Sequence, residues 1–290
     1  MNQAQSNTLG ALWMVGSALA FTAMGLLIKF SGATLSPYQI AFFRCLFGLV
    51  ALLPFFGQLR WSAFRTSRPD LHILRLCVGV TAMFCMFYSL TALPYATAIS
   101  ISFARPLFLV LLAVLVLGET VGWRRGLATV TGFVGVLVIM RPGAEGWNWD
   151  MLVALAAALL IAAAMVIIKK LSRSDPPITI LLWFSIATTI ATAGPAYLVW
   201  IWPDPTLLAA LVLVGAFGTL GQYMGVKALA AGDASAIAPF EFSQILFACL
   251  GGLLFFSEVP DLPTILGAAI IMAAVLYILW RETQIKKAGS

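Results

Sequence analysis

The sequence predicts an all-α polytopic membrane protein whose ten transmembrane helices form two inverted repeats of five. Composition is the first observation: hydrophobic residues make up 62% of the chain and charged residues 10%, whereas soluble domains carry roughly a quarter charged residues. The second is a series of ten apolar stretches, each long enough to cross a hydrocarbon core of about 30 Å. Their length and lack of polar alternation favour helices over strands. The third is an internal repeat.

The first apolar stretch begins at Leu9 with no basic segment before it, so it is expected to be a membrane span and not a cleavable signal peptide. Polar turns and short loops separate the later stretches. The ten expected spans are Leu9–Phe30, Pro37–Phe56, Leu71–Leu93, Ala96–Leu117, Trp123–Met140, Met151–Ile168, Ile178–Trp200, Thr206–Ala230, Ala236–Phe256 and Leu262–Trp280.

The second half of the chain repeats the pattern of the first at an offset of 139 or 140 residues. Each half therefore holds five spans, within residues 1–145 and 146–290. An odd number of spans reverses the second half in the membrane, and such inverted repeats meet near the midplane. The aligned pairs include Lys29 with Lys169, Pro37 with Pro177, Phe103 with Phe242, Phe108 with Phe247, Glu119 with Glu258 and Arg141 with Arg281.

The basic residues predict the orientation of the chain. Of the 17 Lys and Arg residues, twelve lie at loops and span ends on the side of the N-terminus, two on the other side and three inside spans. Cytoplasmic loops carry the excess of Lys and Arg, so both termini are expected in the cytoplasm, with the chain in a bacterial-type inner membrane. The net charge of +6 is therefore assigned to orientation and not to nucleic-acid binding.

Each half has a short hairpin, a fourth span that ends in Gly-Glu or Ser-Glu, and a glycine-containing fifth span that ends in Arg. On these features the whole chain resembles the EamA type of the drug/metabolite transporter superfamily. The resemblance implies a central cavity lined by spans 1, 3, 4, 6, 8 and 9, and solute export more often than uptake. The second half departs from the first in its proline, so symmetric kinks are not expected. The residues concerned are Pro106, Gly118-Glu119, Gly126, Gly132, Gly135 and Arg141, then Pro239, Ser257-Glu258, Gly267 and Arg281.

Glu241 is the only acidic residue well inside a predicted span, where a carboxylate is costly unless it faces a cavity or a partner. It is a candidate for contact with a substrate amine or for proton coupling; the alternatives are a structural ion pair and a protonated side chain. Arg105 lies at a similar depth in span 4. It is a candidate for binding a substrate carboxylate, or for pairing with Glu241 or a helix C-terminus.

Further polar and aromatic residues cluster on the same central spans. As a group they indicate a mixed pocket suited to an amphipathic small molecule, although a single Ser or Thr in a membrane helix more often serves packing. The candidates for substrate binding, besides Arg105 and Glu241, are Tyr88, Tyr95, Ser102, Trp183, Tyr223 and Gln244. The four cysteines lie in apolar segments and His72 is the only histidine, so neither a metal site nor a cofactor is expected.

The resemblance, together with the Arg105 and Glu241 pair and the aromatic candidates, favours a secondary transporter that exports small metabolites, above all amino acids with aromatic or apolar side chains, by alternating access through a central cavity. The alternative substrates are other amphipathic metabolites or cationic drugs: nucleoside-like, S-adenosylmethionine-like or vitamin compounds. A membrane-embedded enzyme is disfavoured because HExxH, GxSxG and paired intramembrane aspartates are absent from the sequence. The expected partners are the substrate and the lipid bilayer, without nucleic acid; monomer and dimer stay open.

Overall fold

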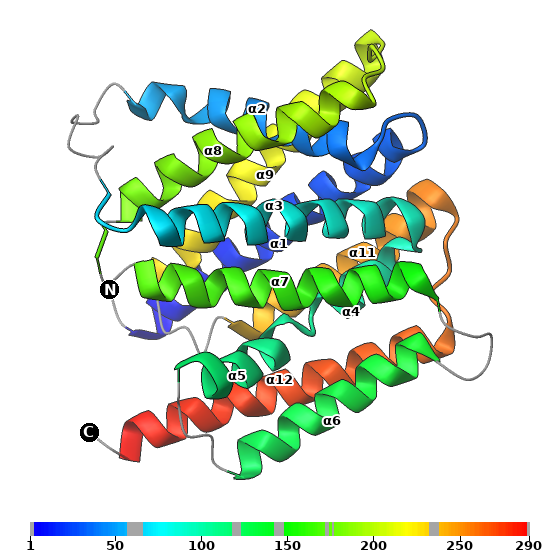
Figure 1. Ribbon diagram of the computed structural model, residues 1–290. Helices are drawn as coiled ribbons and strands as arrows, with labels where there is room; N and C mark the ends of the chain where they lie inside the picture. Colours follow the sequence, from blue (N-terminus) through cyan, green and yellow to red (C-terminus); the bar gives the residue numbers. More distant parts are fainter. Residues whose placement is uncertain are drawn as a thin grey trace.

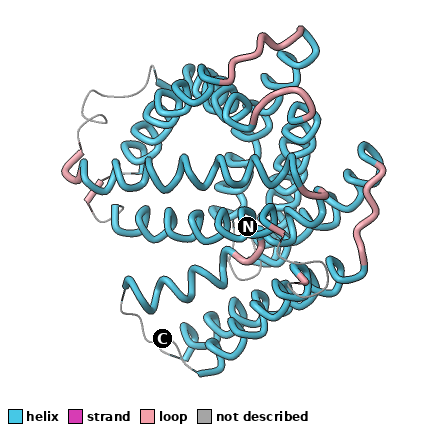
Figure 2. Tube along the Cα trace, turned by 45° about the vertical axis from the view of Figure 1, so that its right-hand side comes forward, coloured by secondary structure: helices cyan, strands magenta, loops and turns pink. Residues whose placement is uncertain are grey.

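The fold was analysed in a computed structural model, which describes residues 3–56, 66–117, 123–141, 148–171, 174–175, 177–231 and 238–288. Every regular element in these residues is a helix (Figure 2). The first half holds α1 (Gln3–Gly32), α2 (Pro37–Phe56), α3 (Pro69–Ala92), α4 (Tyr95–Ser102), α5 (Arg105–Leu117) and α6 (Trp123–Met140). The second half holds α7 (Trp149–Leu171), α8 (Pro177–Leu198), α9 (Pro205–Ala231), the 3₁₀ helix η2 (Ala238–Phe242), α11 (Ser243–Phe256) and α12 (Leu262–Ala288).

The predicted all-α, ten-span architecture is confirmed, with two spans built from two pieces each. The fourth span consists of α4 and α5, and the ninth of η2 and α11. Five described helical segments are long and apolar enough to cross a membrane: Thr8–Gly32, Pro69–Ala92, Tyr95–Val116, Trp149–Ile168 and Pro205–Ala228. Shorter apolar helices cover Pro37–Ala51, Gly126–Met140, Phe240–Phe256 and Leu262–Ile278. The expected Gly118-Glu119 pair and the second hairpin, at 232–235, lie outside the described residues.

Both fourth spans are interrupted near the same aligned position, although in different ways. In the first half a turn at Phe103 and Ala104 separates α4 from α5, and Pro106 stands in the first turn of α5, where its missing N–H costs no helical hydrogen bond. In the second half the chain passes from 3₁₀ to α geometry at Phe242. The two halves are therefore interrupted at the same aligned position, but with different backbone geometry. Each break leaves backbone and polar side chains at depth, which membranes tolerate only around a cavity or inside protein.

The helix contacts follow the inverted repeat. Helix α1 packs along α9, and its repeat partner α7 packs along α3, while α6 pairs with α12 and α2 with α8 (Figure 1). Exchanging the two halves maps these pairs onto one another, as expected for a pseudo-two-fold axis in the membrane plane. Helix α1 begins and α12 ends at the same end of the bundle, on the left in Figure 1. That placement fits two termini on one side of the membrane; the cytoplasmic assignment of that side stays a prediction.

Glycines on α9 allow it to approach both α1 and α2 closely. A Cβ added at Gly215 would lie 2.5 Å from Cβ of Phe47 on α2, and one at Gly221 would lie 3.2 Å from the ring of Phe21 on α1. The Ser17 hydroxyl donates to the Gly221 carbonyl at 2.7 Å, so α1 and α9 are also joined by a hydrogen bond. Small residues at such interfaces are the usual means of packing helices in a membrane.

Candidate functional site

A cavity of about 190 Å³ lies where the two interrupted spans meet. Its polar wall comes from the ends of α4 and η2 and the starts of α5 and α11, because the breaks free these residues from regular helix packing. The polar lining residues are Ser102, Arg105, Glu241 and Gln244. Helices α1, α3, α4 and α7 supply the apolar and aromatic wall, made of Phe21, Met24, Gly25, Met86, Phe87, Leu90, Tyr95, Ile99 and Ile161.

Arg105 and Glu241 face each other across this cavity in a loose ion pair. Nη2 of Arg105 lies 3.5 Å from Oε1 of Glu241, beyond the usual range for an N–H···O hydrogen bond. The Arg105 side chain is 28% exposed and that of Glu241 is 47% exposed. Nε of Arg105 also donates to the Ser102 carbonyl at 2.9 Å, one of the carbonyls that the end of α4 leaves without a helical partner. Both structural partners expected for Arg105, the glutamate and a helix C-terminus, are thus present together.

Two aromatic rings mark the meeting point of the halves. Phe103 and Phe242, which the repeat aligns, stack with ring centroids 4.8 Å apart and planes 26° from parallel. The guanidinium carbon of Arg105 lies 5.8 Å from the Phe103 ring centroid, within the range of a cation–π contact. Beside this stack, Ser102 aligns with Glu241 and Arg105 aligns with Gln244. Each half therefore contributes the charge that the other lacks.

Tyr95 connects the cavity to the first helix. Its side chain is fully buried, and its hydroxyl donates to the Thr22 carbonyl at 3.0 Å. Gly25 permits this approach, since a Cβ added there would lie 2.2 Å from the Tyr95 hydroxyl oxygen. The Tyr95 backbone N–H donates to Oε2 of Glu258 at 2.8 Å, so the same residue is held from the end of α11.

A family model for the EamA-like transporter family matches the chain twice, over residues 8–141 and 148–280. The chain belongs to the EamA-like transporter family. The two matches together cover most of the sequence, and each contributes one of the two interrupted spans around the cavity.

Several curated relatives are similar over nearly their whole length. An S-adenosylmethionine uptake transporter of Rickettsia bellii is 34% identical, with 100% of this chain and 99% of the relative covered. A riboflavin transporter of Rhizobium johnstonii is 33% identical, covering 94% and 91%. The pseudopaline exporter CntI of Pseudomonas aeruginosa is 28% identical, covering 92% and 94%. A solved crystal structure with 18% identity superposes with a TM-score of 0.60 over 90% of this chain and 94% of its own, which supports the fold alone.

Within this EamA-like fold, five of the eight predicted binding residues line the cavity and three do not. The five are Arg105, Glu241, Tyr95, Ser102 and Gln244. Tyr88 is 41% exposed and donates to Asp150 at 2.8 Å. Trp183 packs on the His72 ring at 5.8 Å, and Tyr223 is 54% exposed. These three side chains are not among the residues that line this cavity, so their ring contacts with a substrate stay a prediction.

The sequence reasoning missed the apolar side of the cavity. Phe21, Met86 and Phe87 supply side chains that resemble any others in an apolar span, and no sequence signal separates them. It also missed the partnership of Lys29 with Glu258, whose ammonium and carboxylate lie 2.6 Å apart. Here a signal existed: both residues stand in the repeat alignment, where Lys29 aligns with Lys169 and Glu258 aligns with Glu119.

A buried polar cluster joins the halves at the end of the bundle where α3 begins. Asp175, between α7 and α8, has a side chain only 3% exposed and accepts hydrogen bonds from Thr66, the Ser67 hydroxyl at 2.8 Å and Nε2 of His72 at 2.9 Å. Burial alone would raise the pKa of Asp175, but the hydrogen bonds from Thr66, His72 and Ser67 outweigh it and hold that pKa well below its ordinary value. Asp175 is thus an ionised carboxylate whose hydrogen bonds join the two halves.

Proposed function

We propose that this chain is a secondary transporter for a small amphipathic metabolite that carries both a carboxylate and a positive charge, with S-adenosylmethionine as the first candidate. The observation that carries the proposal is the loose pair of Arg105 and Glu241 in the cavity between the two halves. A guanidinium suits a carboxylate, and a carboxylate suits an ammonium or sulfonium. A substrate with both charges can replace the internal pair without leaving either charge unpaired at depth.

The remaining lining matches the remaining parts of such a molecule. Phe21 and Phe87 line the cavity with aromatic rings, which suit contact with a flat purine. S-adenosylmethionine combines an amino-acid end, a sulfonium and a purine nucleoside. The relatives named S-adenosylmethionine uptake transporters, at 33–35% identity, support this choice over free amino acids.

Riboflavin is disfavoured by the same site, although relatives at 29–33% identity are named riboflavin transporters. Its isoalloxazine and ribityl chain carry no net charge at neutral pH. Neither group could form an ionic contact with Arg105 or Glu241. Separating these two residues around riboflavin would therefore leave both charges without a partner.

The volume of the cavity supports alternating access. About 190 Å³ is below the roughly 300–1,000 Å³ of pockets that bury drug-sized ligands. The halves must therefore part before a nucleoside-sized molecule enters, as in transporters that rock one repeat against the other. Such a carrier works in both directions, so the substrate gradient and not the fold sets uptake or export; the relatives include proteins named for each.

Counterflow in proteoliposomes tests the proposal. Vesicles preloaded with unlabelled S-adenosylmethionine should accumulate external radiolabelled S-adenosylmethionine, whereas vesicles preloaded with riboflavin or without protein should not. Vesicles preloaded with phenylalanine and given external radiolabelled phenylalanine test the amino-acid alternative. Exchange of phenylalanine or riboflavin by folded protein that exchanges no S-adenosylmethionine would overturn the substrate assignment.

A further inference from the structure

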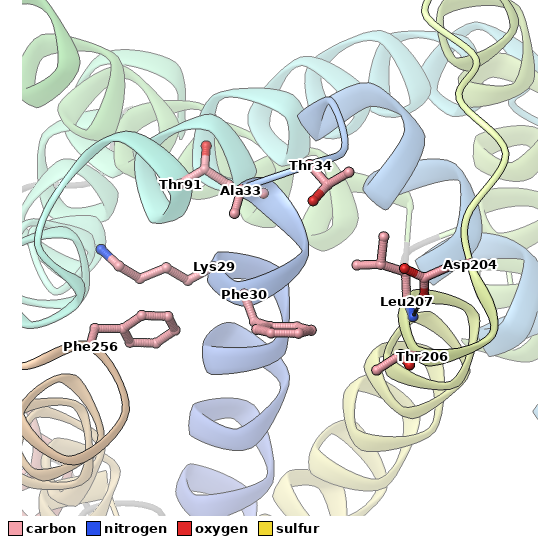
Figure 3. Close-up of a pocket in the computed structure, with 10 residues that line it drawn as sticks. Lys29, Phe30, Ala33, Thr34, Thr91, Asp204, Thr206, Leu207 and Phe256 are labelled. Atoms are coloured by element: carbon pink, nitrogen blue, oxygen red, sulfur yellow. Dashed lines mark hydrogen bonds between the residues drawn. The ribbon is translucent and has the colours of Figure 1, made fainter.

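A second cavity, of about 420 Å³, opens at the end of the bundle where α1 ends and α9 begins (Figure 3). Figure 3 shows Lys29 and Phe256 on one side of it and Asp204 and Thr206 on the other. We call this cavity the vestibule. Like the central cavity it combines charges of both signs with aromatic rings, so it offers related chemistry to the same class of molecule.

The vestibule and the central cavity are neighbours along two helices. On α1, Phe21 and Gly25 line the central cavity, and Lys29 lines the vestibule one turn further on. Residues four apart share a helix face and differ in depth by about 6 Å. On α3, Leu90 lines the central cavity and the next residue, Thr91, lines the vestibule. The two cavities therefore adjoin each other along α1 and α3, and a path from the end of the bundle to the Arg105–Glu241 pair would pass Lys29.

Lys29 and Glu258, which we call the latch, lie where the two cavities adjoin: Lys29 lines the vestibule and Glu258 is its ion-pair partner. Nζ of Lys29 lies 2.6 Å from Oε1 of Glu258 and donates to the Leu93 carbonyl at 2.6 Å. The other oxygen of Glu258 accepts the Tyr95 N–H at 2.8 Å. The latch therefore ties the end of α1, the hairpin between α3 and α4, and the end of α11 into one contact, which joins the two halves of the chain.

Tyr95 makes the latch part of the central cavity as well. Its backbone is held by Glu258, and its ring lines the space beside Arg105 and Glu241. Tyr95 is thus a single residue that contacts the latch through its backbone and also lines the central cavity.

We propose that the latch is the gate between the vestibule and the central cavity, so that passage at this end requires Lys29 and Glu258 to separate. This inference rests on the proposed transport function. A carboxylate that arrives in the vestibule meets Lys29 first and competes with Glu258 for its ammonium, so a zwitterionic substrate helps to open its own path.

A second ion pair at the same end of the bundle provides a matched control. Arg141 and Asp261 also join the two halves, but their side chains are 38% and 55% exposed and they line neither cavity. Asp261 additionally accepts the Thr264 N–H at the start of α12, a contact that Asn can keep. Asp261→Asn should therefore weaken a comparable pair without opening the path.

Thiol labelling tests the gate without any substrate. In a background with all four cysteines replaced, Met24→Cys reports on the central cavity and Ala33→Cys on the exposed end of α1. A membrane-impermeant maleimide is added on the side that labels Ala33→Cys. Glu258→Gln and Lys29→Met, each in the Met24→Cys background, should raise its labelling rate about tenfold or more, which corresponds to about 1.4 kcal/mol of lost closure. Asp261→Asn should leave the rate unchanged.

The outcomes separate the gate from the transport proposal. Unchanged labelling of Met24→Cys in both latch variants, or equal acceleration by Asp261→Asn, overturns the gate even if S-adenosylmethionine is transported. Accelerated labelling in the latch variants alone supports the gate even if no S-adenosylmethionine exchanges. Lys29→Met and Glu258→Gln remove the pair from opposite sides, so a folding defect in one leaves the other as the test, with Ala33→Cys labelling and a monodisperse elution profile as the measures of folding.

Discussion

Neutralising the central pair one residue at a time, and then both together, distinguishes a substrate site from a structural ion pair. At 3.5 Å and an effective dielectric constant of about 20, two unit charges attract by about 5 kcal/mol. Glu241 is nearly half exposed, however, and solvated pairs of this kind contribute only about 0.2–1 kcal/mol. A substrate carboxylate bound to Arg105 would gain about 1.5–3 kcal/mol, the range for hydrogen bonds to charged groups. The exchange is favourable, so the internal pair is not a barrier to binding.

Arg105→Gln and Glu241→Gln should therefore each raise the KM of S-adenosylmethionine counterflow by roughly tenfold, since about 1.4 kcal/mol is a factor of ten. We expect a loss of binding free energy at the low end of the range for hydrogen bonds to charged groups. Each single variant loses one substrate contact, but the substrate no longer has to separate the Arg105–Glu241 pair, which offsets part of that loss. The double variant should raise KM by about 100-fold or more, because both substrate contacts are lost while the cost of separating the pair is removed only once. Lys227→Gln, a basic residue of α9 outside the cavity, is the control and should keep the wild-type KM.

A double variant that is no more impaired than the single variants would refute this reasoning. If Arg105 and Glu241 serve only each other, each single variant strands one charge at depth, and the double variant restores neutrality. The double variant would then transport at least as well as either single variant. The same pattern in thermal stability, without any change in KM, would reduce the pair to a structural contact.

Three other perturbations test separate parts of the structure. Gly25→Ala should displace the Tyr95 ring and weaken S-adenosylmethionine binding. Gly16→Ala is the control and should leave binding unchanged, because its added methyl group meets only the flexible end of a methionine. Equal affinities of the two variants in a thermal-shift titration would contradict this prediction. Asp175→Asn should lower thermal stability at pH 7, since hydrogen bonds to a charged group contribute about 1.5–3 kcal/mol. Because folding lowers the pKa of Asp175, the wild-type advantage should be constant above about pH 5 and shrink as pH falls below about 4, towards the lower folded pKa; an advantage that grows in acid would show the wrong sign. If Glu241 couples protons, Glu241→Gln should flatten the pH dependence of transport at saturating substrate, and an unchanged profile would restrict it to binding.

Hydropathy was sufficient to predict the helices and their order, because a membrane span must satisfy its backbone within one apolar segment. Charge was sufficient to find Arg105 and Glu241, since a charged residue at depth is costly and stands out against an apolar span. Which face of each helix lines the cavity could not be predicted from the sequence. Tyr95 faces it while Tyr88 and Tyr223 do not, and no polar stripe along these helices indicates the difference. The interrupted geometry around Phe103 and Phe242 likewise depends on contacts between the halves.

The two ion pairs along the path differ in the way that their proposed roles require. The central pair is 3.5 Å apart, partly exposed and easily exchanged for a ligand. The latch is 2.6 Å apart, its lysine is 11% exposed, and both partners hold additional backbone groups. A binding pair as tight as the latch would compete with the substrate, and a gate as loose as the central pair would leak. Weakening the latch should therefore raise leakage through the closed transporter. Tightening the central pair should instead lower the affinity for the substrate.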